Sequence, residues 1–303
     1  MTGADGATAR TAPAMRVVLD ALPLQVRSAG IAAYTDGLVR SLAAQHPEVE
    51  FALFGLPARL LGERGGSRAP YPANVRWITT LAYPLVTGTP IMGLPRLVRL
   101  ERVLGAPTLY HATNYAAPRA RAVPLVLTVH DLALLRAPEL GTPSLRRLLA
   151  NLPSAARAAA RLIADSEATA RDLRELLGVP AERIRVVHLG CDARFRPVED
   201  SPARRAVLQR YGILEPYLLH VGTIEPRKNL PALVRAFARL CAGRRQPPRL
   251  VLAGARAWGD AALRRALAAE DPHLPIAVVG PVAADDLPAL YSAADHLGER
   301  AGV

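Results

Sequence analysis

The chain has 303 residues, of which 50% are hydrophobic, and it carries a formal net charge of +12. This composition is typical of a soluble globular protein with enough apolar material for two domains of roughly 150 residues. Aromatic residues make up only 5% and no run of five basic residues occurs, so we expect no nucleic-acid partner. The two cysteines, Cys191 and Cys241, lack a CxxC partner or a nearby histidine pair, which argues against a disulfide framework or a zinc site.

The first part of the chain alternates short β-rich apolar runs with amphipathic helical stretches. Residues 1–14 contain no apolar signal-peptide core and are predicted to be a disordered tail, and no apolar stretch is long enough to span a membrane. Strands are predicted at 15–20, 50–55, 75–79, 108–112, 124–130, 161–166 and 184–190, and helices at 31–45, 93–104, 144–160 and 169–177.

The same rhythm restarts after a polar, proline-bearing stretch at 192–202, which is typical of a linker. Further strands are predicted at 217–222, 249–254 and 276–280, and further helices at 230–241, 261–269 and 286–293. Strand, helix, strand in this order indicates parallel sheets with crossover helices. The predicted fold class is therefore α/β, with two Rossmann-like doubly wound domains, 15–196 and 197–303, that face a cleft as the default ligand site.

The turn after the first predicted strand has no GxGxxG sequence, so the main signal of a dinucleotide-binding dehydrogenase is missing. It does place Ser28, Ala29 and Gly30 directly before a helix, where small residues let backbone N–H groups meet an anion or a sugar hydroxyl. A helix simply capped by Ser28 is the other interpretation.

The turn after the strand at 217–222 contains Lys228, the only lysine among 38 basic residues. Gly222 and Thr223 end the strand, Arg227 and Lys228 follow, and Asn229 is predicted to cap the next helix. Two cations beside a helix N-terminus suit a diphosphate, since each charge pair at about 4 Å is worth on the order of 4 kcal/mol gross. A solvated basic turn is the alternative, but solvation would not discriminate lysine from arginine in this composition. Because no DxD-like acidic pair lies near a strand end, we expect no bound metal and no separate cofactor.

Seven segments together resemble glycosyltransferase family 4, retaining enzymes of the GT-B fold that use nucleotide sugars. In chain order they are SAGIAAYTDGL, HATNY, LTVHDLALL, ADSEATARDL, VVHLGCDARFRP, GTIEPRKNL and VVGPVAADDLPALYSAADHL. The resemblance runs from about residue 15 to residue 297, and no single motif carries it.

The resemblance implies roles for individual residues. His130, followed by Asp131, is similar to the family residue that contacts the donor sugar near the reacting carbon, so these two are the candidate catalytic residues. His111 and Asn114 would line the acceptor side. The resemblance assigns Gly30, Gly222, Thr223, Arg227 and Lys228 to the donor diphosphate, and Gly280, Pro281 and Val282 to the nucleotide base.

What the resemblance implies is transfer of a hexosyl group, mannose first, from a nucleoside-diphosphate sugar to a glycan or lipid-linked acceptor in cell-surface polysaccharide biosynthesis. The reaction would keep the anomeric configuration, with positive charge around the leaving diphosphate. Residues 1–196 carry 24 arginines against 15 acidic residues, an excess of +9. We therefore expect a cytoplasmic protein with salt-sensitive peripheral contact to an anionic membrane at its inner face.

Family members continue beyond the equivalent of SAADHL with a segment that bears two glutamates eight positions apart. Here Glu299 has no second glutamate after it, so the second domain is expected to be truncated and the activity impaired. Two alternatives stay open: a catalytically inactive fragment that binds nucleotide sugar without turnover, and a GT-B-like sugar-nucleotide epimerase that releases an epimerised sugar without an acceptor.

Overall fold

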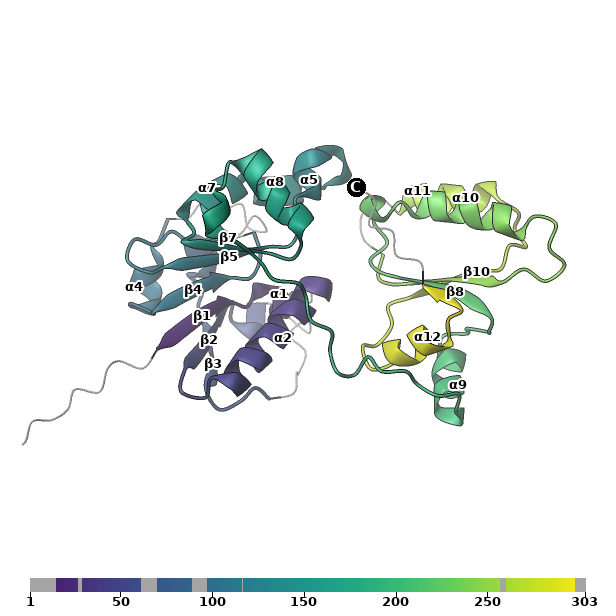
Figure 1. Cartoon of the computed structure of the whole chain (residues 1–303), viewed down its shortest axis with the longest axis horizontal. Coiled ribbons are helices and arrows are strands. Elements are labelled where there is room, and N and C mark those ends of the chain that lie inside the picture. The colour runs from purple at the N-terminus through teal and green to yellow at the C-terminus, as the bar shows by residue number, and fades with distance from the viewer. Residues whose placement is uncertain are drawn as a thin grey trace, which may run out of the picture. The chain divides into compact units, whose positions relative to one another are not determined.

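The computed structural model describes residues 15–26, 29–60, 70–88, 97–115, 117–256 and 260–297. The predicted tail 1–14 therefore lies outside the described residues. The chain divides into two compact units, Met1–Gly190 and Cys191–Val303, whereas the predicted boundary fell between residues 196 and 197 (Figure 1).

The first unit is built on a parallel sheet of seven strands, counted over the described residues, in the order β3-β2-β1-β4-β5-β6-β7. Between β1 and β4 the order reverses direction, which is the switch point of a doubly wound sheet. The strands are β1 (Arg16–Asp20), β2 (Glu50–Gly55), β3 (Val75–Thr79), β4 (Leu109–Ala112), β5 (Leu125–Val129), β6 (Arg161–Ala164) and β7 (Ile184–Val186).

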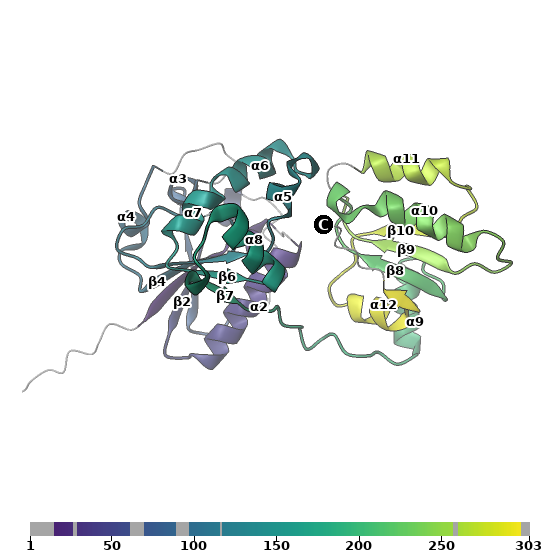
Figure 2. The ribbon, with the colours of Figure 1, turned by 45° about the horizontal axis from the view of Figure 1, so that its top comes forward.

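Helices cover both faces of this sheet. Figures 1 and 2 show α7 (Leu152–Ala158) and α8 (Glu167–Leu177) on one face and α2 (Ala29–Gln45) on the other. Side chains of β1 alternate accordingly, because Val18 packs in the core under α7 and α8 while Leu19 packs in the core under α2. The shorter helices are α1 (Leu22–Gln25), α3 (Tyr83–Thr87), α4 (Leu100–Leu104), α5 (Ala133–Arg136) and α6 (Pro143–Ala150), with 3₁₀ turns η1 (Ala58–Leu60), η4 (Pro138–Leu140) and η5 (Ala181–Arg183).

The largest differences between prediction and structure in this unit concern three elements. The single helix predicted at 144–160 is two helices, α6 and α7, because Pro153 cannot continue a helix and sits in the first turn of α7. The helix predicted at 93–104 is present only as α4, and residues 93–96 lie outside the described part. The strand predicted at 184–190 ends at Val186, because its one partner strand, β6, ends at Ala164 opposite it.

The second unit repeats this plan with a parallel sheet in the order β10-β9-β8-β11 over its described residues. One face packs against α9 and α12 and the other against α10 and α11, which gives two separate apolar cores. The elements are α9 (Pro202–Arg210), β8 (Tyr217–Val221), the 3₁₀ turn η6 (Pro226–Lys228), α10 (Leu230–Cys241), β9 (Arg249–Ala253), α11 (Ala261–Ala269), β10 (Ile276–Gly280), α12 (Leu287–Ala293) and β11 (His296–Leu297).

Helix α9 was not predicted, and its sequence explains why. Its only buried residue is Leu208, so no apolar stripe marks it. Ser201 supplies its start instead, since the hydroxyl oxygen accepts a hydrogen bond from the amide of Arg204 at 3.2 Å. Asn229 does sit at the start of α10, but in the left-handed conformation (φ 47°) and without the predicted side-chain cap.

Candidate functional site

Four polar residues gather at the carboxyl edge of the first sheet. Asp20 is the last residue of β1, Thr113 follows β4, His130 follows β5 and Asp165 follows β6. β1 and β4 flank the switch point, where doubly wound sheets bind their ligands, and β5 and β6 are the next two strands of the sheet. The edge is therefore the candidate site of the first unit.

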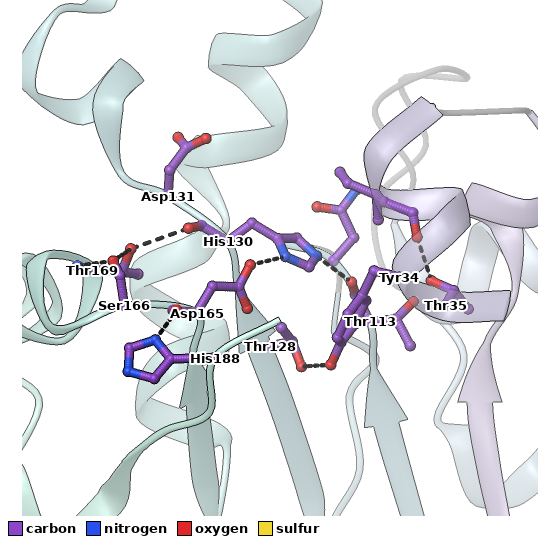
Figure 3. A network of polar contacts seen from close by, with 12 residues as sticks. Tyr34, Thr35, Thr113, Thr128, His130, Asp131, Asp165, Ser166, Thr169 and His188 are labelled. Carbon is purple, nitrogen blue, oxygen red and sulfur yellow. Dashed lines mark hydrogen bonds and ion pairs between the residues drawn. The ribbon is translucent and has the colours of Figure 1, made fainter. Parts of the chain in front are cut away.

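His130 is held at this edge by contacts at both ring nitrogens (Figure 3). Nδ1 lies 2.6 Å from Oδ2 of Asp165, and Nε2 lies 3.0 Å from the main-chain oxygen of Thr113. The main-chain oxygen of His130 in turn accepts a hydrogen bond from the Thr169 hydroxyl at 3.1 Å. The ring is only 13% exposed and is thus fixed in one orientation.

Both partners of the His130 ring are acceptors, a carboxylate oxygen and a carbonyl oxygen. The two contacts are hydrogen bonds only when both ring nitrogens carry hydrogen. With both hydrogens present, the ring is an imidazolium that donates at both ends, and its Nε2–H group is directed at the uncharged carbonyl oxygen of Thr113.

A second hydrogen-bonded chain runs beside His130. The hydroxyl of Thr128, on β5, lies 2.8 Å from Nε2 of His111 and 2.9 Å from the hydroxyl of Tyr34. The Tyr34 ring meets His130 edge-on, with ring centroids 4.9 Å apart. Burial, assisted by the nearby His130, lowers the pKa of His111 to about 4, so this ring is neutral at physiological pH.

His111 is therefore a buried member of the sheet, with 6% exposure, and its acceptor-side role stays a prediction. Asn114 also stays a predicted acceptor-side residue; it is partly exposed and its Oδ1 accepts from the amide of Tyr115 at 2.8 Å. Asp131, the other candidate catalytic residue, accepts a hydrogen bond from the amide of Ala133 at the start of α5. In Figure 3 its carboxylate points away from the His130 ring.

Asp20 is the buried acid of the cluster, with 2% exposure. Its Oδ1 accepts hydrogen bonds from the Tyr83 hydroxyl at 2.5 Å and from the amide of Leu22 at 3.1 Å. Burial raises the pKa of Asp20 from 3.8 to about 6, against the lowering effect of these two hydrogen bonds. Its main-chain oxygen accepts from the Thr113 hydroxyl at 2.8 Å, which ties the end of β1 to the end of β4.

Gly30 lies in the first turn of α2 rather than in the loop before it, because the helix begins at Ala29 instead of Ile31. It is exposed, and no atom lies within 4 Å of where a Cβ would be. Ser28, the other residue of the predicted anion-binding turn, lies outside the described residues.

In the second unit, three strands end in glycine at the carboxyl edge of the sheet: Gly222 after β8, Gly254 after β9 and Gly280 in β10. At Gly254 the backbones of the two strand ends come closest, since a Cβ added to Gly254 would lie 1.8 Å from the carbonyl oxygen of Gly222. The missing side chains thus let two backbone segments lie close together at this edge.

The basic turn at this edge differs from the expectation in one respect. Arg227 does not project as an uncompensated cation, because its guanidinium donates to Oε1 of Glu225, with Nε at 3.0 Å and Nη2 at 2.7 Å. Glu225 is buried, with its side chain 7% exposed. Lys228 is half-buried, and its Cε lies 3.9 Å from the position of a Cβ added to Gly222. Lys228 therefore lies beside the end of β8, and the role of both cations toward a phosphate stays a prediction.

The predicted base-binding segment follows β10. Gly280 has a positive φ of 74° and its carbonyl accepts from the amide of Gly254 at 2.8 Å. Pro281 is exposed, and Val282 packs partly against the core under α9 and α12. The role of this segment in binding a nucleotide base stays a prediction.

Sequence reasoning missed Asp165. A signal existed, because TVHD and IADS both place polar residues directly after apolar strands. Recognising that those strands are neighbours would have brought His130 and Asp165 together.

Within the described residues, no group of three or more histidine, cysteine or acidic side chains is placed to hold a metal ion. In the same part of the chain, no helix is both long and apolar enough to cross a bilayer. The expectation of no metal and no cofactor stays a prediction.

Curated proteins that resemble parts of the chain include the following two. O-antigen chain mannosyltransferase B of Escherichia coli is 32% identical over 189 residues, which are 61% of this chain and 49% of that protein. A D-inositol 3-phosphate glycosyltransferase of Kribbella flavida is 36% identical over 139 residues, 44% of this chain and 32% of that protein. The match to these relatives thus spans about half of their length or less.

Solved structures that share the fold include the following two. Anabaena HepE in complex with UDP and glucose matches with a TM-score of 0.59 at 21% identity, over 94% of this chain and 73% of that one. WaaG, a glycosyltransferase involved in lipopolysaccharide biosynthesis, matches with a TM-score of 0.58 at 16% identity, over 93% of this chain and 74% of that one. These likenesses show that the fold class is GT-B.

The sequence profile of Glycosyltransferase Family 4 matches residues 28–195, more than half of the chain. This range contains Thr113, His130 and Asp165, which lie at the carboxyl edge of the first sheet. The chain therefore belongs to glycosyltransferase family 4.

Proposed function

We propose that the chain transfers a hexosyl group, with mannose as the first candidate, from a nucleoside-diphosphate sugar to a glycan or lipid-linked acceptor. The transfer keeps the anomeric configuration and serves cell-surface polysaccharide biosynthesis. The observation that carries the proposal is the fixed imidazole of His130 at the switch point of the first sheet, in a chain of this family.

The first unit supports the proposal through the chemistry of that edge. An imidazole that donates hydrogen bonds can bind and orient a sugar hydroxyl or a phosphate oxygen. Asp165 holds the ring at Nδ1, so a ligand has to replace only the Thr113 carbonyl at Nε2.

The second unit supports it through the glycine-ended strands and Lys228. Gly222 and Gly254 place backbone without side chains at the sheet edge, and Lys228 adds an ammonium group beside Gly222. Positive charge next to a diphosphate stabilises the charge that develops as the sugar leaves. The relative named O-antigen chain mannosyltransferase B favours mannose as the sugar.

The binding test is a calorimetric titration of the chain with GDP, UDP, ADP and dTDP, repeated with Lys228→Ala. We expect the preferred nucleotide to bind the variant roughly 10- to 100-fold more weakly, as for the loss of one hydrogen bond to a charged group. Arg235→Ala, which removes an exposed cation from α10, is the control and should bind like the unchanged chain. Equal affinity of Lys228→Ala and the unchanged chain would contradict the proposed phosphate site.

The transfer test follows release of GDP from GDP-mannose with and without a lipid-linked glycan acceptor. NMR of the product gives the anomeric configuration, and an inverted product would refute the retaining reaction. Tight nucleotide binding with no turnover would favour an inactive binding protein, and a free epimerised sugar formed without acceptor would favour an epimerase.

Peripheral membrane contact is the remaining part of the proposal. Its support is the excess of +9 charges in residues 1–196. Binding to vesicles should rise with their content of anionic lipid and fall with added salt. Binding that is indifferent to both would remove this part of the proposal.

A further inference from the structure

Asp165 and His130 occupy equivalent places on two neighbouring strands. Val129 of β5 is in register with Ala164 of β6, and His130 and Asp165 are the next residues of the two strands. Their side chains therefore meet at the carboxyl edge, with Nδ1 and Oδ2 at 2.6 Å. The contact follows from the register of the sheet and needs no loop to form it.

The carboxylate of Asp165 serves little else. Its Oδ1 is buried and, among the described residues, has no hydrogen-bond partner. A buried carboxylate that only ties a fold together normally satisfies both oxygens, because each unpaired buried oxygen costs free energy. The main-chain oxygen of Asp165, not its side chain, makes the contact to Nδ1 of His188 at 3.2 Å.

The other end of the His130 ring faces a partner that is easily exchanged. Nε2 lies 3.0 Å from the carbonyl of Thr113, an uncharged oxygen that also belongs to the edge. An oxygen of a bound nucleotide sugar can replace this carbonyl without any change at Nδ1. Nδ1 does not exchange its partner in this way, because that partner is a carboxylate and its contact is shorter than the one at Nε2.

We propose that Asp165 is a positioning residue that acts through His130. It keeps a hydrogen on Nδ1 and a second on Nε2, so that Nε2–H is a hydrogen-bond donor that passes from the Thr113 carbonyl to an oxygen of the nucleotide sugar. His130 then binds the donor substrate as a hydrogen-bond donor and does not accept a proton from the acceptor. This inference rests on the proposed function for its substrate, whereas the state of the His130 ring can be tested without it.

The state of the ring is tested by NMR of the ¹⁵N-labelled chain. The signals of His130 are identified by their loss in His130→Gln. We expect both ring nitrogens of His130 to carry hydrogen, and Asp165→Asn to abolish that pattern. A single protonated nitrogen in the unchanged chain, or an unaltered pattern in Asp165→Asn, would overturn the proposal. The first of these results needs no variant and decides the question even if Asp165→Asn does not fold.

The role in transfer is tested by a double-mutant cycle on kcat/KM for the nucleotide sugar. Asp165→Asn should lower kcat/KM by roughly 10- to 100-fold in the unchanged chain, the loss of one hydrogen bond to a charged group. In the His130→Gln background it should cause no further loss, because the two residues act as one unit. Equal losses in both backgrounds would mean that the carboxylate acts through packing, and would overturn the proposal.

Asp172→Asn is the matched control. Asp172 lies on α8, close to Asp165 in sequence, and its carboxylate pairs with Arg136 rather than with the edge. This variant should keep the kcat/KM of the unchanged chain. If the unchanged chain shows no transfer at all, the proposed function fails, and the NMR result still decides whether Asp165 sets the state of the His130 ring.

Discussion

Replacing Asp20 by asparagine should stabilise the first unit at neutral pH. The carboxyl group is 2% exposed, and among the described residues no cation lies within ion-pair distance of it. Its hydrogen-bond donors are the Tyr83 hydroxyl and the Leu22 amide, both neutral. An asparagine oxygen can accept from both, so the substitution removes the buried charge and keeps the two hydrogen bonds.

The magnitude follows from the pKa of Asp20, which burial raises from 3.8 to about 6. Because the pKa is raised in the folded state, the carboxyl group favours folding fully below pH 3.8, and this stability is lost as pH rises through 6. Two pKa units correspond to about 3 kcal/mol at neutral pH. The free energy of unfolding of Asp20→Asn should thus exceed that of the unchanged chain by up to about 3 kcal/mol above about pH 7.

Urea denaturation between about pH 4.5 and 8 measures this difference. The gain of Asp20→Asn over the unchanged chain should grow by about 2 kcal/mol from about pH 4.5 to 7 and then level off. Tyr83→Phe is the companion variant, because the Tyr83 hydroxyl makes a contact that lowers the pKa of Asp20. Without this contact, the pH range over which the unfolding free energy falls should move to higher pH. If the curves of Asp20→Asn and the unchanged chain run parallel over the whole range, the carboxyl group is not a buried charge and the reasoning fails.

The remaining predictions concern pH, backbone packing and a helix cap. The pKa of His111 falls from 6.5 to about 4 on folding. The free energy of unfolding of the unchanged chain should therefore fall by about 3 kcal/mol as the pH drops from 6.5 through 4. His111→Gln should lack this loss in the same denaturation series. Gly254→Ala should lower the melting temperature, at a cost of more than about 2 kcal/mol, because its Cβ would lie 1.8 Å from the Gly222 carbonyl oxygen. Gly37→Ala, at an exposed helical position with no atom within 4 Å of the added Cβ, should instead raise it slightly, and calorimetry that finds both changes equal would contradict the clash. Ser166→Ala should cost about 1 kcal/mol in the same calorimetric measurement, because the hydroxyl caps α8; no change would mean that the cap contributes nothing.

The order of strands and helices was readable from the sequence because most of the strands are buried on both faces or alternate strictly between two cores. Such strands appear as short apolar runs between helical stretches, and β2, which is buried along most of its length, was predicted with the bounds that the structure has. Helix α10 was equally clear, since Leu230, Val234 and Phe237 recur at helical spacing and all three are buried. Helix α9 was not predicted, because it buries a single side chain and therefore shows no apolar periodicity.

The position of His130 at a strand end was likewise a matter of sequence, because a polar residue after an apolar run marks the edge of a parallel sheet. What holds its ring was decided only by tertiary structure. Thr113 and Asp165 are 17 and 35 residues away from His130 along the chain, and they reach it only because β4 and β6 lie on either side of β5. Strand order is a property of the packed sheet and leaves no local trace, so the sequence determined which residues could be functional and the fold determined which of them act together.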